Sequence, residues 1–140
     1  MVDDERFMLD ASVRILKRQD ASWETQTFDS GWDAWGHLQQ HPADVVLTDL
    51  RMPGMSGIAL VRRLRNHAAN RDTPIVVLTG SNDVEEKSQA LDMGATDLLS
   101  KPIHPVDLVA RVRNALRLKR YQDALKSRNA ELEQAVHERT

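Results

Sequence analysis

Two short apolar runs constrain the fold of this chain more than any other feature. They are Val45–Thr48 and Ile75–Thr79, which are mostly β-branched and do not alternate with polar residues. Strands of this kind are covered on both faces, as in the centre of a parallel sheet flanked by helices. Apolar runs also alternate with amphipathic stretches from residue 1 to about residue 116. We therefore expect an α/β fold with a doubly wound parallel sheet.

Three weaker segments complete the expected sheet. Trp23–Phe28 predicts an edge strand, Asp97–Ser100 a short strand, and Met1-Val2 a truncated first strand. Gly94 follows a helical pattern and suits a left-handed helix end. The helices are expected at residues 5–19, 31–40, 58–66 and 84–93.

The C-terminal part of the chain predicts a single long helix. No proline or glycine follows Pro105. From Leu118 on, apolar residues follow a 3-4 spacing that places Leu118, Leu125 and Leu132 at heptad position d. Asn129 falls at position a, where a buried amide favours a parallel pair of helices. We therefore divide the chain into a domain at residues 1–117 and a helical, coiled-coil linker at 118–140 that forms a homodimer; a solvated terminal helix is the alternative.

Composition excludes several classes of function. The chain has no cysteine, so disulfides, thiol nucleophiles and cysteine-ligated metals are absent. No apolar run approaches the roughly 20 residues that span a bilayer, and the N-terminus is acidic where a signal peptide is basic. We expect a cytoplasmic protein without membrane contact. A net charge of -2 argues against direct nucleic-acid binding, and we interpret Arg62, Arg63 and Arg65 as solvated.

Three carboxylates fall at expected strand ends. Asp3 and Asp4 follow Met1-Val2, and Asp49 follows Val45–Thr48. Ligands of open parallel sheets bind beyond the carboxyl ends of the strands, so these side chains should face one crevice. Crowded carboxylates favour a hard divalent cation, most simply Mg²⁺. With that cation, one carboxylate could attack a phosphoryl group and form an acyl phosphate.

Two further strand ends carry groups that suit phosphate oxygens. Thr79 supplies a hydroxyl at the end of Ile75–Thr79, and Lys101 supplies an ammonium after Asp97–Ser100. Each residue alone is a weak signal. Their joint order along the chain indicates a phosphate site.

Four segments carry a resemblance to a known family. They are Val2–Glu5, Val46–Gly57, Val77–Gly80 and Ser100–Pro102, and they resemble successive signatures of bacterial response-regulator receiver domains over about residues 1–117. The resemblance implies a flavodoxin-like five-stranded sheet of order 2-1-3-4-5, the order found in the chemotaxis member of the family.

The resemblance also implies roles for the site residues. Asp49 would accept a phosphoryl group from a sensor histidine kinase or a phosphotransfer protein in a two-component phosphorelay. Mg²⁺ would bind Asp3, Asp4, Asp49 and the backbone carbonyl of Arg51. Thr79 and Lys101 would contact the phosphoryl oxygens, and the Lys101–Pro102 peptide bond would be cis. The protein would then be no enzyme beyond catalysing its own phosphorylation and dephosphorylation, and its linker would lead to an output domain.

The sequence departs from the family at one switch position and leaves two other readings open. Leu98 stands where many members carry an aromatic residue that moves on activation. A phosphorylation-independent dimerisation domain is the alternative, although the intact site residues argue against it. A phosphatase that works through an aspartyl phosphate would need a second Asp two residues after the nucleophile, where Arg51 stands.

Overall fold

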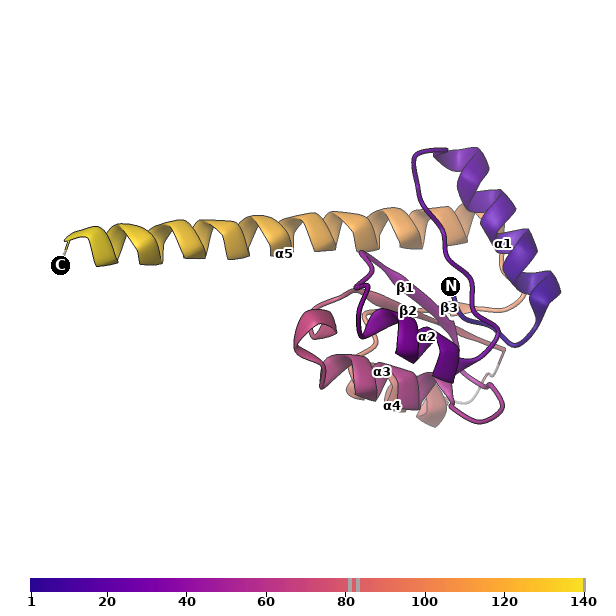
Figure 1. Cartoon of the computed structure of the whole chain (residues 1–140). Coiled ribbons are helices and arrows are strands. Elements are labelled where there is room, and N and C mark those ends of the chain that lie inside the picture. The colour runs from indigo at the N-terminus through magenta and orange to yellow at the C-terminus, as the bar shows by residue number, and fades with distance from the viewer. Residues whose placement is uncertain (81, 83, 140) are drawn as a thin grey trace.

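The chain folds as an α/β domain from which one long helix projects (Figure 1). The structure, a computed structural model, describes the backbone of residues 1–80, 82 and 84–139 and the side chains as far as residue 136. The elements follow in the order α1 (Arg6–Gln19), α2 (Gly31–Leu38), β1 (Val46–Asp49), α3 (Gly57–Arg65), the 3-10 helix η1 (Ala68–Asn70), β2 (Ile75–Thr79), α4 (Val84–Asp92), β3 (Asp97–Ser100) and α5 (Pro105–Arg139).

The three strands form a parallel sheet of order β1-β2-β3. Val46 pairs with Ile75 at one end, and Thr79 pairs with Ser100 at the other. Every residue of β1 and β2 is buried, as expected for strands covered on both faces. The α/β fold with a parallel sheet is therefore confirmed.

The five-stranded sheet itself stays a prediction. Within the described part of the chain, the expected first and edge strands contribute only isolated parallel bridges, from Val2 to Phe28 and from Val2 to Thr48. The physical reason is that Met1-Val2 is too short to continue a ladder on either side. The bridges nonetheless place the Phe28 segment, Val2, β1, β2 and β3 side by side in that order.

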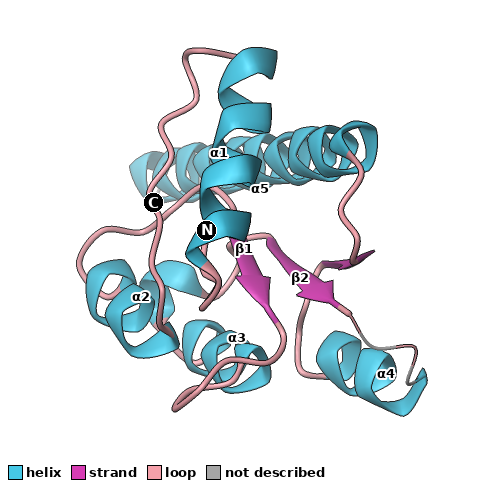
Figure 2. Ribbon diagram, turned by 90° about the vertical axis from the view of Figure 1, so that its right-hand side faces the viewer, coloured by secondary structure: helices cyan, strands magenta, loops and turns pink. Residues whose placement is uncertain are grey.

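Helices cover both faces of the sheet (Figure 2). On one face, α1 and α5 enclose a core that includes Leu16, Val76 and Leu108. On the other face, α2, α3 and α4 enclose a second core around Leu60 and Ile75. Truncating such fully buried aliphatic side chains costs about 2–5 kcal/mol each, so these cores hold the strand ends in place.

Local signals explain where the helices begin and end. The hydroxyls of Ser30 and Ser56 accept hydrogen bonds from the third residue of α2 and α3, respectively. Gly94 follows α4 with a φ of 113°, as its sequence context predicts. The four shorter predicted helices all form, with ends shifted by at most two residues.

The interpretation of the three arginines as solvated is wrong for Arg65. This side chain is half-buried, and its guanidinium donates to the carbonyl of Gly94 at 2.9 Å and to that of Thr73 at 2.6 Å. Arg63 stacks over Trp32, with 4.8 Å from the guanidinium carbon to the ring centroid. Arg65 thus ties α3 to the loops before β2 and β3.

Helix α5 changes its surroundings along its length. Near its start, Leu108 and Val112 are buried against the sheet, whereas Leu125 and Leu132 are exposed further along. Thr140, the end of the predicted linker, lies outside the described residues. Within the described residues, no helix has the length and apolar character needed to cross a membrane.

Candidate functional site

The carboxyl ends of the strands bring together acidic side chains from two parts of the chain. Asp49 is the last residue of β1. The bridge from Val2 to Thr48 runs parallel to β1, so the next residues, Asp3 and Asp4, leave the sheet on the same side as Asp49. One backbone bond fixes this placement: the Asp49 amide donates to the carbonyl of Val2 at 2.8 Å.

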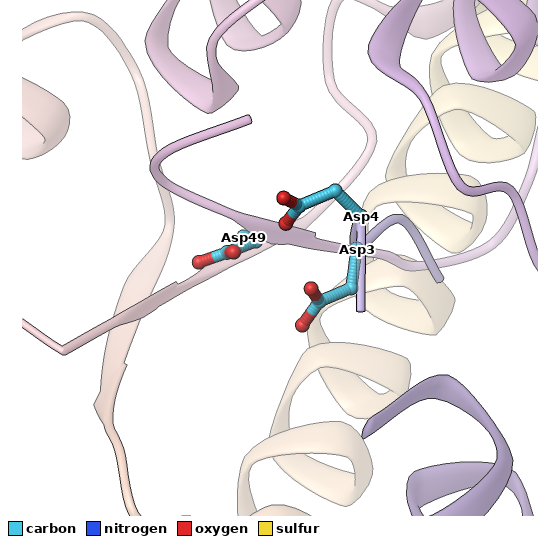
Figure 3. A group of neighbouring side chains, drawn as sticks. All are labelled: Asp3, Asp4 and Asp49. Carbon is cyan, nitrogen blue, oxygen red and sulfur yellow. The ribbon is translucent and has the colours of Figure 1, made fainter. Parts of the chain in front are cut away.

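The three carboxylates lie next to one another (Figure 3). Each offers an oxygen, and these oxygens lie within 4.8 Å of one another. Asp3 is fully buried, Asp49 is nearly so, and Asp4 is exposed. The crevice is therefore closed on the side of Asp3 and open to solvent on the side of Asp4.

Lys101 supplies the positive charge of the site. It follows β3, is joined to Pro102 by a cis peptide bond as expected, and has a side chain that is 20% exposed. Its Nζ atom lies 3.3 Å from Oδ2 of Asp3 and 3.3 Å from Oδ1 of Asp49. One ammonium thus bridges two carboxylates that would otherwise repel each other across the strand ends.

Burial and charge shift the ionisation of the central pair. Burial raises the pKa of Asp49, and the nearby negative charge of Asp3 raises it further, against the opposing effect of Lys101. Burial by itself would lower the pKa of Lys101, but the charges of Asp49 and Asp3 outweigh it and the pKa is raised. The ionised carboxylate of Asp49 is thus disfavoured in the native state, and the ammonium of Lys101 is favoured.

The two oxygens of Asp49 differ in their surroundings. Oδ1 accepts a hydrogen bond from the Leu50 amide at 2.9 Å and is the oxygen that faces Lys101. Among the described residues, Oδ2 has no hydrogen-bond donor or ion-pair partner in the protein. Oδ2 is therefore the oxygen available to an incoming group.

Thr79 and Leu98 occupy neighbouring strands beside the acidic crevice. Thr79 is buried at the end of β2, and its carbonyl accepts from the Lys101 amide at 2.8 Å. Leu98 is half-buried within β3 and packs against the core that α2, α3 and α4 enclose.

Arg51 has a partner that no sequence pattern predicted. The Arg51 side chain is exposed, and its guanidinium makes a two-pronged ion pair with Glu86 of α4, at 2.9 Å from Nε to Oε1 and 2.8 Å from Nη2 to Oε2. The pair joins the loop after β1 to α4. The acidic first turn of α4 was the only sequence signal, and it does not identify a partner.

The donor set fits a hard divalent cation. Carboxylate oxygens converge from Asp3, Asp4 and Asp49, and the chain has no cysteine. Oxygen-only ligands with one solvent-exposed side match the preference of Mg²⁺ for carboxylates together with water.

The chain matches the response regulator receiver domain over residues 1–113. It belongs to this family. The receiver-domain family and function expected from the four sequence segments are thereby confirmed.

Curated relatives support the same conclusion. The chain is 37% identical over 141 residues to the cyclic di-GMP phosphodiesterase response regulator RpfG of Xanthomonas campestris, covering 97% of this chain and 36% of RpfG. It is 35% identical over 132 residues to the response regulator PleD of Caulobacter vibrioides, covering 93% of this chain and 28% of PleD. The chain thus spans only about a third of either relative.

A solved structure shares the fold. The chemotaxis protein CheY4 of Vibrio cholerae is 32% identical and superposes with a TM-score of 0.75, covering 82% of this chain and 94% of that one. The receiver domain therefore accounts for the strands and the surrounding helices.

Proposed function

We propose that this receiver domain stores a signal as an aspartyl phosphate on Asp49. The observation that carries the proposal is the surroundings of that carboxylate: it is buried at a strand end, lies beside Asp3 and Lys101, and has Oδ2 available. A sensor histidine kinase or a phosphotransfer protein of a two-component system would be the donor.

The proposed transfer is a substitution at phosphorus. Oδ2 of Asp49 attacks the phosphorus of a phosphohistidine, an O–P bond forms, and the P–N bond breaks. The electron pair of the broken bond stays with the imidazole, which takes up a proton from water. The acyl phosphate places new negative charge beside Lys101 and Thr79, whose ammonium and hydroxyl suit phosphate oxygens.

We propose Mg²⁺ as the metal, held by Asp3, Asp4 and Asp49 together with the backbone carbonyl of Arg51. When bound, the cation neutralises phosphoryl oxygens and the crowded carboxylates. The protein's own residues do the rest. The positive charge of Lys101 offsets the repulsion between the carboxylates of Asp3 and Asp49, and the Leu50 amide orients the Asp49 side chain.

Mass spectrometry after incubation with acetyl phosphate and Mg²⁺ tests the assignment. The parent chain should gain one phosphoryl group, and Asp49→Asn should gain none. Asp92→Asn, which changes an exposed carboxylate on α4, is the matched control and should behave as the parent. An unchanged mass gain in Asp49→Asn would place the acceptor elsewhere.

The same experiment separates the alternatives that the sequence left open. A phosphorylation-independent dimerisation domain would show no mass gain in the parent. A phosphatase would release phosphate repeatedly from added phosphomonoesters, whereas a receiver domain should act only on its own acyl phosphate. We propose that the receiver domain itself catalyses only its own phosphorylation and dephosphorylation, and that it works in the cytoplasm.

We propose that α5 dimerises the protein and connects the receiver to an output domain. Leu125, Leu132 and Val136 are 58%, 62% and 62% exposed, which is unusual for apolar residues repeated at heptad spacing on a single helix. Residues 118–140 would form the coiled-coil linker.

The nature of the output is suggested by how far the relatives align. RpfG and PleD align over 97% and 93% of the chain, whereas the response regulator GtcR aligns over 84%. The similarity to RpfG and PleD thus includes more of α5. We therefore favour an output concerned with cyclic di-GMP, as the name of RpfG states for that protein. Purification of the full-length protein and assay of cyclic di-GMP hydrolysis with and without acetyl phosphate would test this output.

A further inference from the structure

Two histidines lie one helical turn apart at the end of α2. His37 is in the last turn of the helix, and His41 follows four residues later. The His41 amide donates to the His37 carbonyl at 2.9 Å, so the helical turn continues past Leu38 as far as His41. Pro42 comes next and cannot continue the helix. Because residues four apart on a helix share one face, the two imidazoles project from the same side of α2.

The rings of these two residues lie next to each other. Their centroids are 4.8 Å apart, and their planes are tilted by 32°. The His37 ring also contacts Phe28, with 5.1 Å between the ring centroids. His37 is half-buried and His41 is exposed. The His37 ring is thus held by its neighbours, whereas the exposed His41 side chain has room to rotate.

The ring nitrogens of both residues are available to a ligand. Among the described residues, neither imidazole makes a hydrogen bond or an ion pair; their contacts are those between rings. His67 differs, because its Nδ1 atom lies 3.0 Å from Nδ2 of the buried Asn70. A neutral imidazole without a hydrogen-bond partner offers the lone pair of one nitrogen to a metal ion. His37 and His41 can therefore bind a metal without breaking a hydrogen bond.

The separation of the two rings suits one shared cation. Bonds of about 2.0–2.1 Å from zinc to each imidazole require the two nitrogens to lie within about 4.2 Å of each other. Rings with centroids 4.8 Å apart reach this separation through a rotation of the exposed His41 side chain. Imidazole nitrogen suits Zn²⁺, Cu²⁺ and Ni²⁺, whereas Mg²⁺ prefers oxygen ligands. The pair therefore suits a transition metal and not the cation of the acidic crevice.

The surroundings of the pair favour a cation and lie away from the acidic crevice. Glu24 and Asp44 line the same surface hollow as His37 and His41, and their negative charge attracts cations. Within the described part of the chain, no third histidine or carboxylate is close enough to complete a ligand set with the pair. The hollow adjoins the start of β1, whereas Asp49 ends that strand. Cations at the two places would therefore not compete for the same ligands.

We propose that His37 and His41 form a two-histidine clamp for Zn²⁺ or a chemically similar transition-metal ion, with water at the remaining coordination positions. A cation bound to both imidazoles would also fix the end of α2, because it joins two residues one helical turn apart. The clamp is independent of the proposed phosphorylation of Asp49 and of the proposed Mg²⁺ site.

Calorimetric titration with ZnCl₂ tests the clamp. His41→Ala should weaken Zn²⁺ binding about tenfold or more, because loss of a metal ligand costs at least as much as loss of a group that supports one. His104→Ala, which changes another exposed histidine, is the matched control and should bind Zn²⁺ as the parent does. Asp4→Ala should also retain the site. Loss of Zn²⁺ binding in Asp4→Ala, with normal binding in His41→Ala, would place the metal in the acidic crevice and overturn the clamp.

Nitrogen NMR of the imidazoles identifies the ligands. On addition of ZnCl₂, one ring nitrogen of His37 and one of His41 should shift together, and those of His104 should stay in place. Cu²⁺ should displace Zn²⁺ from the pair, and Mg²⁺ should not. A shift of His41 alone, or equal Zn²⁺ affinity in the parent and His41→Ala, would overturn the clamp. One Zn²⁺ bound per two chains would assign the metal to a contact between copies and overturn it as well.

Discussion

The ammonium of Lys101 lies 3.3 Å from Oδ1 of Asp49, although β2 separates β1, which carries Asp49, from β3. Lys101 follows β3 and reaches back across the strand ends to Asp49 on β1. The same nitrogen also contacts Asp3. A single flexible side chain thus connects three parts of the chain at the site, and its loss has consequences that can be measured.

Replacing Lys101 with Met should destabilise the protein at neutral pH by about 2 kcal/mol. Removing one member of a buried ion pair typically costs about 3–5 kcal/mol, and the partial exposure of Lys101 reduces that figure. The raised pKa of Lys101 adds a pH signature: its stabilising contribution is present below the usual lysine pKa and is lost as pH rises through the raised value. Urea unfolding of parent and variant at pH 7 and above pH 10 measures both effects. Equal stability at pH 7 would contradict the bridging role.

Asp49→Asn should be more stable than the parent at pH 7 in the absence of Mg²⁺. The raised pKa of Asp49 means that the native state binds its proton more tightly than the unfolded state does. The parent therefore loses stability as pH rises from the usual aspartate pKa through the raised one, and the neutral amide avoids this loss. Thermal unfolding between pH 4 and pH 7 should show the advantage growing with pH. A variant whose deficit grows with pH would refute the argument.

Asp4→Ala should remove most of the stabilisation that Mg²⁺ confers on the parent. At ten times the dissociation constant, a single site adds about 1.4 kcal/mol to the free energy of unfolding. Asp10→Ala is the matched control, because Asp10 is an exposed acidic residue on α1 outside the acidic crevice. Differential scanning calorimetry with and without Mg²⁺ decides the matter, and equal shifts in Asp4→Ala and the parent would place the metal elsewhere.

The ion pair between Arg51 and Glu86 should have a coupling energy of about 0.5–1 kcal/mol. The guanidinium is exposed and the carboxylate is partly covered. The coupling energy should therefore fall in the range measured for surface ion pairs with good geometry. A double-mutant cycle with Arg51→Gln and Glu86→Gln isolates this coupling from the other contacts of each side chain. The coupling should shrink as salt is raised, and a coupling that is independent of salt would indicate packing instead.

Replacing Leu125 and Leu132 with Ala should convert a dimer into a folded monomer. Each d-position leucine contributes about 2 kcal/mol or more to such a pair, and the coil is short. Val106→Ala is the control, because Val106 lies on the same helix and is 81% exposed outside the heptad segment. Light scattering at micromolar concentration gives the mass. A parent that is already monomeric, or a double variant that stays dimeric, would exclude this helix as the pairing surface.

Local sequence patterns identified the part of the site that lies at the strand ends. Val45–Thr48 and Ile75–Thr79 are apolar throughout, so their burial in a parallel sheet follows from composition alone. The residues at the carboxyl ends of such parallel strands must then lie at the same edge of the sheet. For this reason the sequence alone could place Asp49 and Thr79 at that edge. The long α5 could also be predicted from the sequence, because no proline or glycine after Pro105 interrupts a helix.

Tertiary structure decided which side chains meet. The pairing of Arg51 with Glu86, the bridging position of Lys101 and the contacts of Arg65 with carbonyls of two loops all depend on how helices and loops pack against the sheet. The spacing of apolar residues in the sequence predicts the type of an element and which of its faces is buried. The partners of a long charged side chain, by contrast, depend on distances between elements that are far apart in the chain.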